Sequence, residues 1–290
     1  MTEPITIKTK DATDVWHDAS GSDLSHQWRH NTAAQDIPAG LRAVHVWGTL
    51  GWHDIRQRYR RSVIGPFWFT INTALMVAFL GALYATLLKQ PIREYLPFLA
   101  AGLVIWQYIS TVALESCSVF IGAGYIIKQI KLPLTIHVGR LVWRNFIILL
   151  HSLPILILLL VFLGHPSLMS LLLIPAGLVL LLLNGIWVGI VLGILCTRFR
   201  DIPPVVANLV QIAFFFTPVM WTPEILKAHG RGWVAEFNPF YHLIEILRAP
   251  LLGKQPQLIS WVSSISIVIC GFLFAQWLMS RYRGRVAYWL

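Results

Sequence analysis

A run of basic residues stands directly before the first long apolar stretch of the sequence and could bind phosphate. It comprises Arg56, Arg58, Tyr59, Arg60 and Arg61. A guanidinium group can hold a phosphate through two parallel hydrogen bonds, whereas each cation near a membrane adds only roughly 1 kcal/mol of attraction to an anionic surface. Specific capture of an anionic head group therefore requires these side chains to converge, with Tyr59 positioning the head. The alternative to specific capture is that the same arginines only set the orientation of the chain in the membrane and contact lipids in general.

Signatures of common catalytic and nucleotide-binding sites are missing from the sequence. There is no G-x-x-x-x-G-K-[ST], H-E-x-x-H or G-x-S-x-G, so we do not expect the chain itself to be a P-loop ATPase or a hydrolase. Cys117, Cys196 and Cys270 fall in apolar segments without metal-ligand spacing and suit packing. We therefore expect no catalytic residue, no metal site and no cofactor in this chain.

Ionisable residues inside apolar segments are few: Glu115, Arg144 and His151. Such residues often serve ion-coupled transport, and a proton relay through Glu115 and His151 is one interpretation. We favour the other, in which Glu115 is structurally paired or solvated in a pore, because a single acid is little support for a carrier. The energy for transport must then come from elsewhere.

Four uncharged polar residues interrupt apolar segments: Asn72, Thr73, Gln211 and Thr217. A polar group facing lipid costs free energy, so each should face water or another helix. We expect the first and fifth apolar spans to line a channel through these residues. Hydrogen bonding between helices is the alternative for any one of them.

The composition is that of an integral membrane protein. Of 290 residues, 56% are hydrophobic and 12% are charged, with a mean hydropathy of +0.65, whereas soluble domains carry about 25% charged residues. Basic residues flanking the spans explain the net charge of +10 more simply than nucleic-acid binding does. Stretches of about 20 apolar residues can cross a bilayer, and we expect six, near residues 67–88, 96–120, 141–163, 168–195, 205–221 and 258–280.

The remaining segments complete an all-α architecture. Residues 1–40 are polar without an apolar run, which predicts a flexible cytoplasmic extension and no signal peptide. Basic residues at steps of three or four in 41–61 predict an amphipathic helix in the membrane interface, with Val44, Gly51 and Ile55 among its inward residues. The excess of Lys and Arg in the loops on one side of the spans places both termini in the cytoplasm. Residues 222–257 predict a pair of re-entrant helices in the outer leaflet, since their apolar run is too short to span.

Several motifs, in order over residues 41–290, resemble those of ABC-2-type permeases that export polysaccharides. They are RYRRSVIGPFW at 58–68, TRFRD at 197–201 followed by FFFTPV at 214–219, and NPF at 238–240 followed by ILRAP at 246–250. The resemblance defines residues 41–290 as an ABC-2-type transmembrane domain. Any one motif is weak, but together they are specific.

The resemblance implies a homodimeric permease in the bacterial inner membrane. Two six-span subunits would enclose a channel, and each would dock a separate ATPase subunit that binds ATP and Mg. The substrate implied is an undecaprenyl-diphosphate-linked polysaccharide, with O-antigen favoured over capsule or teichoic acid. A small-molecule or drug exporter of the same architecture is the alternative, and an ion-coupled carrier is a more distant one.

The connection between the second and third spans is the expected contact with that ATPase. Tyr125–His137 is the longest cytoplasmic connection between spans, and it includes Lys128, Gln129, Lys131 and Pro133. We expect a short helix here to press into a groove of the ATPase subunit. An ordinary basic loop is the alternative.

Overall fold

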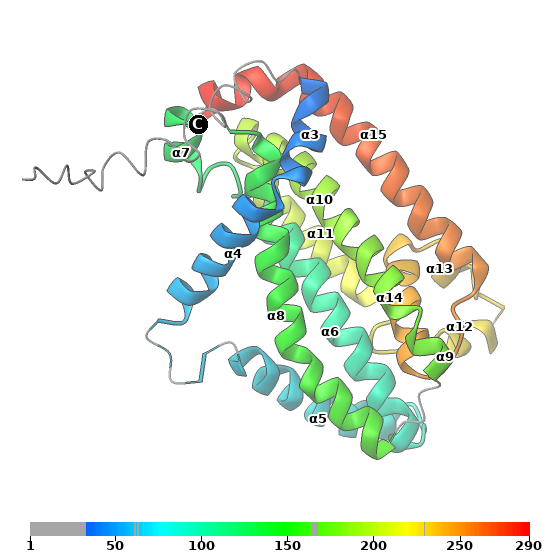
Figure 1. Cartoon of the computed structure of the whole chain (residues 1–290). Coiled ribbons are helices and arrows are strands. Elements are labelled where there is room, and N and C mark those ends of the chain that lie inside the picture. The colour runs from blue at the N-terminus through cyan, green and yellow to red at the C-terminus, as the bar shows by residue number, and fades with distance from the viewer. Residues whose placement is uncertain are drawn as a thin grey trace, which may run out of the picture.

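The structure is a computed structural model that describes residues 33–60, 62, 64–65, 67–130, 132–163, 168–228 and 230–290, and every regular element among them is a helix (Figure 1). The long apolar helices are α5 (Phe67–Leu87), α6 (Ile92–Ser116), α8 (Leu134–Leu163), α10 (Ile174–Arg198, after the short α9, Leu168–Leu171) and α15 (Leu258–Trp289). The shorter helices are α3 (Ala33–Arg42), α4 (Val44–Arg58), α7 (Gly124–Gln129), α11 (Ile202–Phe216), α12 (Pro223–Ala228), α13 (Trp233–Glu236) and α14 (Pro239–Leu251). The expected all-α membrane class is confirmed.

Five helices in the described part of the chain are long and apolar enough to span a bilayer, and the sixth expected span is shorter. It corresponds to α11, which has 15 residues and ends at Phe216, before Thr217 and Pro218. Side chains from further along the chain satisfy its last carbonyls: Trp221 Nε1 donates to Phe215 O at 3.1 Å, and Asn238 Nδ2 donates to Phe216 O at 3.3 Å. The proline break therefore leaves these helix-end carbonyls hydrogen-bonded within the chain.

The N-terminal region differs from the sequence prediction. The flexible extension was expected to reach residue 40, but residues 33–40 belong to α3, and residues 1–32 lie outside the described part. The reason is Asp36, which is fully buried and accepts hydrogen bonds from Leu134 N and Thr135 N, both at 3.2 Å, and from Arg283 Nε at 2.6 Å. Asp36 thus joins α3 to the start of α8 and to α15.

Helix α4 packs on α8 through part of the predicted inward stripe. Gly51 and Ile55 are buried, and Gly51 lies against the α8 backbone at Arg140, where a larger residue would collide. Val44 was expected on the same stripe but is exposed. Helices α3 and α4 pack on α8, which begins at Leu134 and contains the expected third span at 141–163.

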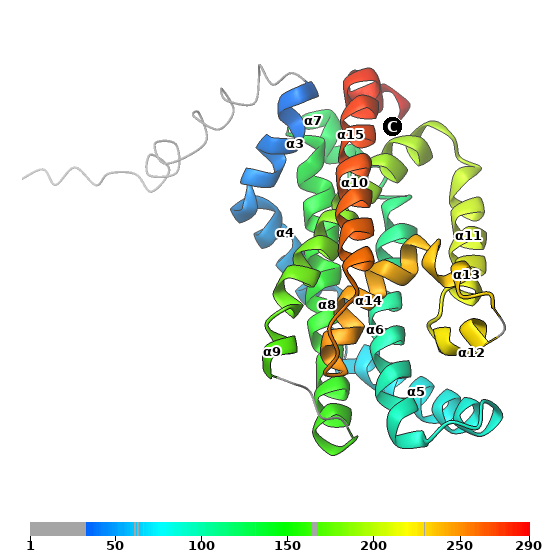
Figure 2. The ribbon, with the colours of Figure 1, turned by 90° about the vertical axis from the view of Figure 1, so that its right-hand side faces the viewer.

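The short helix α14 lies inside the bundle. It contacts α6, α10 and α15, and Figures 1 and 2 show it among these helices. Nine of its residues, including Ile244 and Arg248, are buried. Asn238 caps its start by accepting from Phe240 N at 2.9 Å. We expected a pair of re-entrant helices in residues 222–257, but this segment forms three helices, α12 to α14. The last of them, α14, packs against other helices of the bundle.

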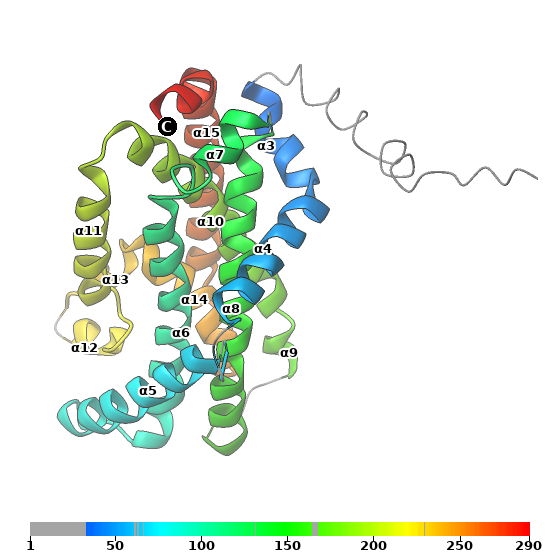
Figure 3. The same cartoon turned by 90° about the vertical axis from the view of Figure 1, so that its left-hand side faces the viewer.

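Helices α5 and α11 lie at the edge of the subunit, as Figure 3 shows. Val206 is the only buried residue of α11, and α5 buries four small or β-branched residues, Thr73, Val77, Gly81 and Ala85. Large apolar side chains such as Phe79 and Phe215 are exposed on these helices. In a membrane, such faces meet lipid or a further protein surface.

Replacing Asp36 tests the junction of α3, α8 and α15. Asp36→Ala removes acceptors from two backbone N–H groups at the start of α8, so we expect the free energy of unfolding to fall by about 1–3 kcal/mol. Asp36→Asn keeps one acceptor oxygen and should lose less. Unfolding in mixed micelles by titration with SDS measures both. The exposed Glu94→Ala is the control, and an Asp36→Ala protein as stable as this control would contradict the assignment.

Candidate functional site

The acidic residue Glu115, at the end of α6, is at the centre of a charged network. Its two oxygens accept from Arg58 Nη2 at 2.9 Å and from Arg144 Nη2 at 2.6 Å, and Asn145 Nδ2 donates to the second oxygen at 2.7 Å. Glu115 is therefore paired with cations from α4 and α8. The pairing interpretation of this residue is confirmed.

Asp54 of α4 extends the network along α8. It accepts from Arg140 Nε at 2.6 Å, again from Arg140 Nη2, and from Arg144 Nη1 at 3.2 Å. Among the described residues, no hydrogen bond joins this network to His151, whose Nδ1 lies 2.7 Å from Ile147 O. The geometry accordingly does not assemble the proton relay considered from the sequence.

The predicted phosphate-binding residues fall into three environments. Arg56, Arg58 and Arg60 are all exposed, but the guanidinium of Arg58 is held by Glu115. Burial alone lowers the pKa of Arg58, but the hydrogen bond and charge of Glu115 raise it above its ordinary value, so this guanidinium stays charged. Tyr59 is partly buried, and burial raises the pKa of its hydroxyl. Arg61 lies outside the described residues. Arg56 and Arg60 are thus the members best placed to reach a ligand.

Three of the four predicted channel residues come together. Asn72, Thr73 and Gln211 line a groove of about 440 Å³ between α5, α6 and α11. Thr73 donates to Gln107 Oε1 at 3.1 Å, which fits the helix-pairing alternative, while Asn72 and Gln211 are exposed. Thr217 was wrongly expected at this surface. It is fully buried at the break after α11, where its hydroxyl accepts from Asn238 Nδ2 at 3.0 Å.

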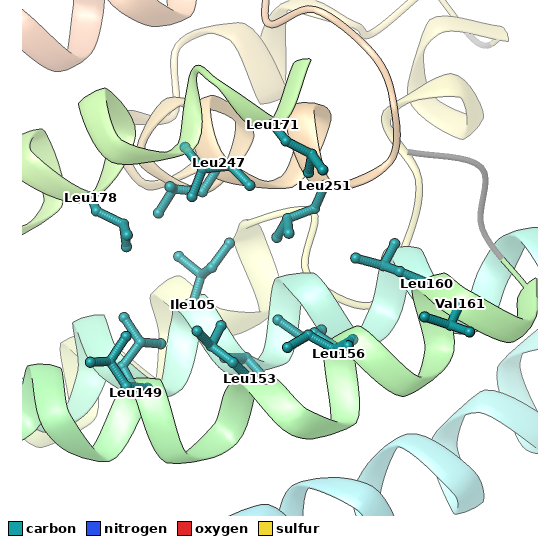
Figure 4. Close-up of a pocket in the computed structure, with 14 residues that line it drawn as sticks. Ile105, Leu149, Leu153, Leu156, Leu160, Val161, Leu171, Leu178, Leu247 and Leu251 are labelled. Carbon is teal, nitrogen blue, oxygen red and sulfur yellow. The ribbon is translucent and has the colours of Figure 1, made fainter. Parts of the chain in front are cut away.

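A second groove, of about 640 Å³, offers no polar chemistry. Figure 4 shows leucine, isoleucine and valine side chains from α6, α8, α10 and α14 facing one another across it. Its lining includes Ile105, Leu153, Leu178 and Leu247, and all its lining residues are aliphatic. Such a surface cannot recognise a sugar or a phosphate. Within the described residues, no group of three His, Cys, Asp or Glu could hold a metal ion either.

The expected short helix between the second and third long helices is present as α7. Lys128 and Gln129 are exposed at its end, next to exposed Tyr125 and Ile130, so this element presents both charged and apolar side chains. Lys131 lies outside the described residues. Pro133 is buried directly before α8. Our expectation that it contacts a partner was therefore wrong, because a buried side chain is not available to another subunit.

Arg248, which the sequence analysis names only within the ILRAP motif, is almost completely buried in the structure, at 1% exposure. Its Nη1 donates to Pro218 O at 2.6 Å, its Nη2 pairs with Glu245 at 2.7 Å, and its guanidinium lies 4.1 Å from the centre of the Phe98 ring. Arg248 thereby ties α14 to the break after α11 and to α6. Besides the ILRAP motif, the local signal in the sequence was the charged pair Glu245 and Arg248 at three-residue spacing inside an apolar run.

Comparison with known proteins defines the class to which this architecture belongs. The family model described as ABC-2 type transporter matches residues 45–252, so the chain belongs to this family. Two relatives from Klebsiella pneumoniae and one from Myxococcus xanthus bear the name O-antigen export system permease protein RfbA.

These relatives are distant in sequence but cover most of the chain. One relative from Klebsiella pneumoniae is 24% identical, over 79% of this chain and 90% of the relative's length. The other is 25% identical, over 66% of this chain and 74% of the relative's length. The relative from Myxococcus xanthus is 23% identical over 69% of this chain and 78% of its own. The family resemblance seen in the motifs is confirmed.

Replacing Arg248 tests its role at the break. Arg248→Met leaves Glu245 and the Pro218 carbonyl without their partner, so we expect the free energy of unfolding to fall by roughly 3–5 kcal/mol, as when one member of a buried pair is removed. Lys254→Met, at an exposed position shortly after α14, should change it by less than about 0.5 kcal/mol. Size-exclusion profiles and SDS titration report both. Equal stability of the two variants would refute the anchoring role.

Proposed function

We propose that this chain is the membrane-spanning permease subunit of an ATP-driven exporter that moves lipid-linked polysaccharide out of the cytoplasm, with O-antigen as the first candidate. The observation that carries the proposal is the similarity to permeases named for O-antigen export, which in one case extends over 90% of the relative. Membership of the ABC-2 type transporter family supports the transport role. In this proposal the protein lies in the bacterial inner membrane with both termini in the cytoplasm.

ATP hydrolysis belongs to a separate subunit in this proposal. The sequence has no P-loop, so ATP and Mg would be bound by the partner ATPase. Helix α7 is the proposed contact, because Tyr125, Lys128 and Gln129 are exposed on it. It lies at the end of the bundle that also holds α3 and the C-terminus, called here the arginine-rich end (Figure 1). Apolar and basic side chains side by side suit a groove with an acidic rim.

A second copy of the chain completes the proposed channel. The exposed apolar faces of α5 and α11 would pair with those of the second subunit, and the groove holding Asn72 and Gln211 would face the passage between them. An amide can hydrogen-bond sugar hydroxyls without binding them as tightly as a charge would. In this proposal Thr217 does not line the channel, and its role is to stabilise the break after α11 through its hydrogen bond with Asn238.

The diphosphate of the lipid carrier is the proposed ligand of the basic run before α5. Arg56 and Arg60 would bind it first, with Arg58, Tyr59 and Arg61 around them. The carboxylates Asp54 and Glu115 neutralise much of the charge on α8, which concentrates anion attraction at the exposed arginines. A small-molecule exporter would not need such a feature.

Complementation of a strain that lacks its O-antigen permease tests the function. We expect surface polysaccharide to return only when this chain and its partner ATPase are both expressed, and the two to co-purify. A cysteine at Gln129 should crosslink to the ATPase, whereas one at exposed Lys254 should not. Export of dyes without polysaccharide would favour the small-molecule alternative, and transport driven by a proton gradient without ATP would favour a carrier.

Accessibility of single cysteines tests the channel. Gln211→Cys should react with membrane-impermeant thiol reagents in a cysteine-free background, and lipid-linked glycan should slow the reaction several-fold. Thr217→Cys should stay unreactive because this position is fully buried. An unreactive Gln211→Cys in a protein that still exports would remove α11 from the channel.

The conservative variant Arg60→Lys separates phosphate capture from simple charge. Lysine keeps the charge but loses the two-pronged guanidinium, so we expect the rate of export to fall about tenfold, equivalent to roughly 1.4 kcal/mol. Arg93→Lys, exposed at the other end of the bundle, should export normally. Full export by membrane-inserted Arg60→Lys would leave the arginine with an orienting role alone.

A further inference from the structure

A polar cavity of about 280 Å³ lies behind the charged network, between the end of α4, the segment after α6 and the first turns of α8. Residues 137, 140, 141 and 144 of α8 contribute one face of it, because side chains at steps of three, four and seven residues share one side of a helix. Arg58, Glu115 and Ser118 close the opposite side. The cavity is several times larger than the roughly 30 Å³ that one water occupies in the liquid.

Two donors in the cavity wall are buried without an acceptor among the described residues. His137 is 3% exposed and neither of its ring nitrogens has a partner, and Arg144 Nε is likewise unpartnered. A neutral imidazole keeps one N–H in either tautomer, so at least one donor remains there. Buried donors are nearly always satisfied in folded proteins, so donors of this kind indicate a bound water or ion.

The charged residues around the cavity favour the binding of an anion inside it. Arg58, Arg140 and Arg144 face the carboxylates of Asp54 and Glu115, so the network retains one excess positive charge. The carboxylates use the Nη groups of Arg144 and leave its Nε directed elsewhere. An oxyanion in the cavity would offer several acceptor oxygens to donors that the carboxylates of the network leave without an acceptor.

We propose that this cavity is an oxyanion site that takes one phosphate group, with His137 and Arg144 Nε as its donors. Both proposed donors lie on α8, and Arg58 is the residue that the cavity wall shares with the basic run before α5. Phosphate is the class favoured because it combines negative charge with several acceptor oxygens and fits the space. The group could belong to free phosphate or to an anionic lipid head group beside the network.

Thermal unfolding of the full-length protein in maltoside micelles tests the site with inorganic phosphate as the probe. We expect phosphate to raise the Tm in a saturable manner, and chloride at equal ionic strength not to do so. His137→Leu should raise the phosphate concentration for half-maximal stabilisation about tenfold, because it removes a donor to a charged group. In phosphate-free buffer it should be at least as stable as the native protein.

The exposed histidine of α4 supplies the matched control, since His53→Leu should keep the native phosphate response. In phosphate-free buffer, nanodiscs with and without phosphatidylglycerol distinguish the two sources of the group. Stabilisation by that lipid, lost in His137→Leu, would identify a head group, and stabilisation by inorganic phosphate alone would identify the free anion.

Absence of both responses in the native protein, or responses that His137→Leu leaves unchanged, would overturn the proposal and leave only water in the cavity. None of these readouts involves transport. A failure of the site and a failure of the export role are therefore separate results.

Discussion

The core of a bilayer offers no water to a backbone break or a buried charge, so each must find its partners within the protein. The break after α11 illustrates the consequence. Pro218 ends the regular helix, and the freed carbonyls are taken up by Trp221, Asn238 and the buried Arg248. Because Asn238 also caps α14, one side chain satisfies the end of one helix and the start of another. This shared hydrogen bonding links the end of α11 to the start of α14, whose apolar residues pack inside the bundle.

The same constraint organises the arginine-rich end. Glu115 and Asp54 are acids in a region rich in cations, and each accepts from two guanidinium groups. The network fixes α4 against α6 and α8, and Asp36 does the same for α3, α8 and α15. Arg58 is thus both a structural partner of Glu115 and a neighbour of the exposed arginines proposed to meet phosphate. A ligand that bound Arg58 would have to compete with that carboxylate.

Some polar side chains of the apolar helices are hydrogen-bonded within the chain, and others are exposed. The first kind stabilises the fold, whereas the second kind could bind a ligand. Thr217 and Arg248 have their partners within the chain and hold the break in place. Asn72 and Gln211 remain exposed in a groove between α5, α6 and α11, next to exposed apolar side chains of α5 and α11. His137 is buried, and its ring nitrogens have no hydrogen-bond partner among the described residues, which is the observation behind the proposed oxyanion site.

The sequence by itself determined the class of the protein, since long apolar runs must lie in a membrane whatever their neighbours are. It also determined the proline break, the short helix α7 and the family, because these depend on local residues or on a linear motif. Only the tertiary structure decided that Pro133 and Thr217 are buried, that Glu115 pairs with Arg58 and Arg144, and that α14 packs in the interior. Local periodicity tells which side of a helix is polar, but not which helix that side meets. Contacts such as Asp36 with Arg283 join opposite ends of the chain, so no local pattern could reveal them.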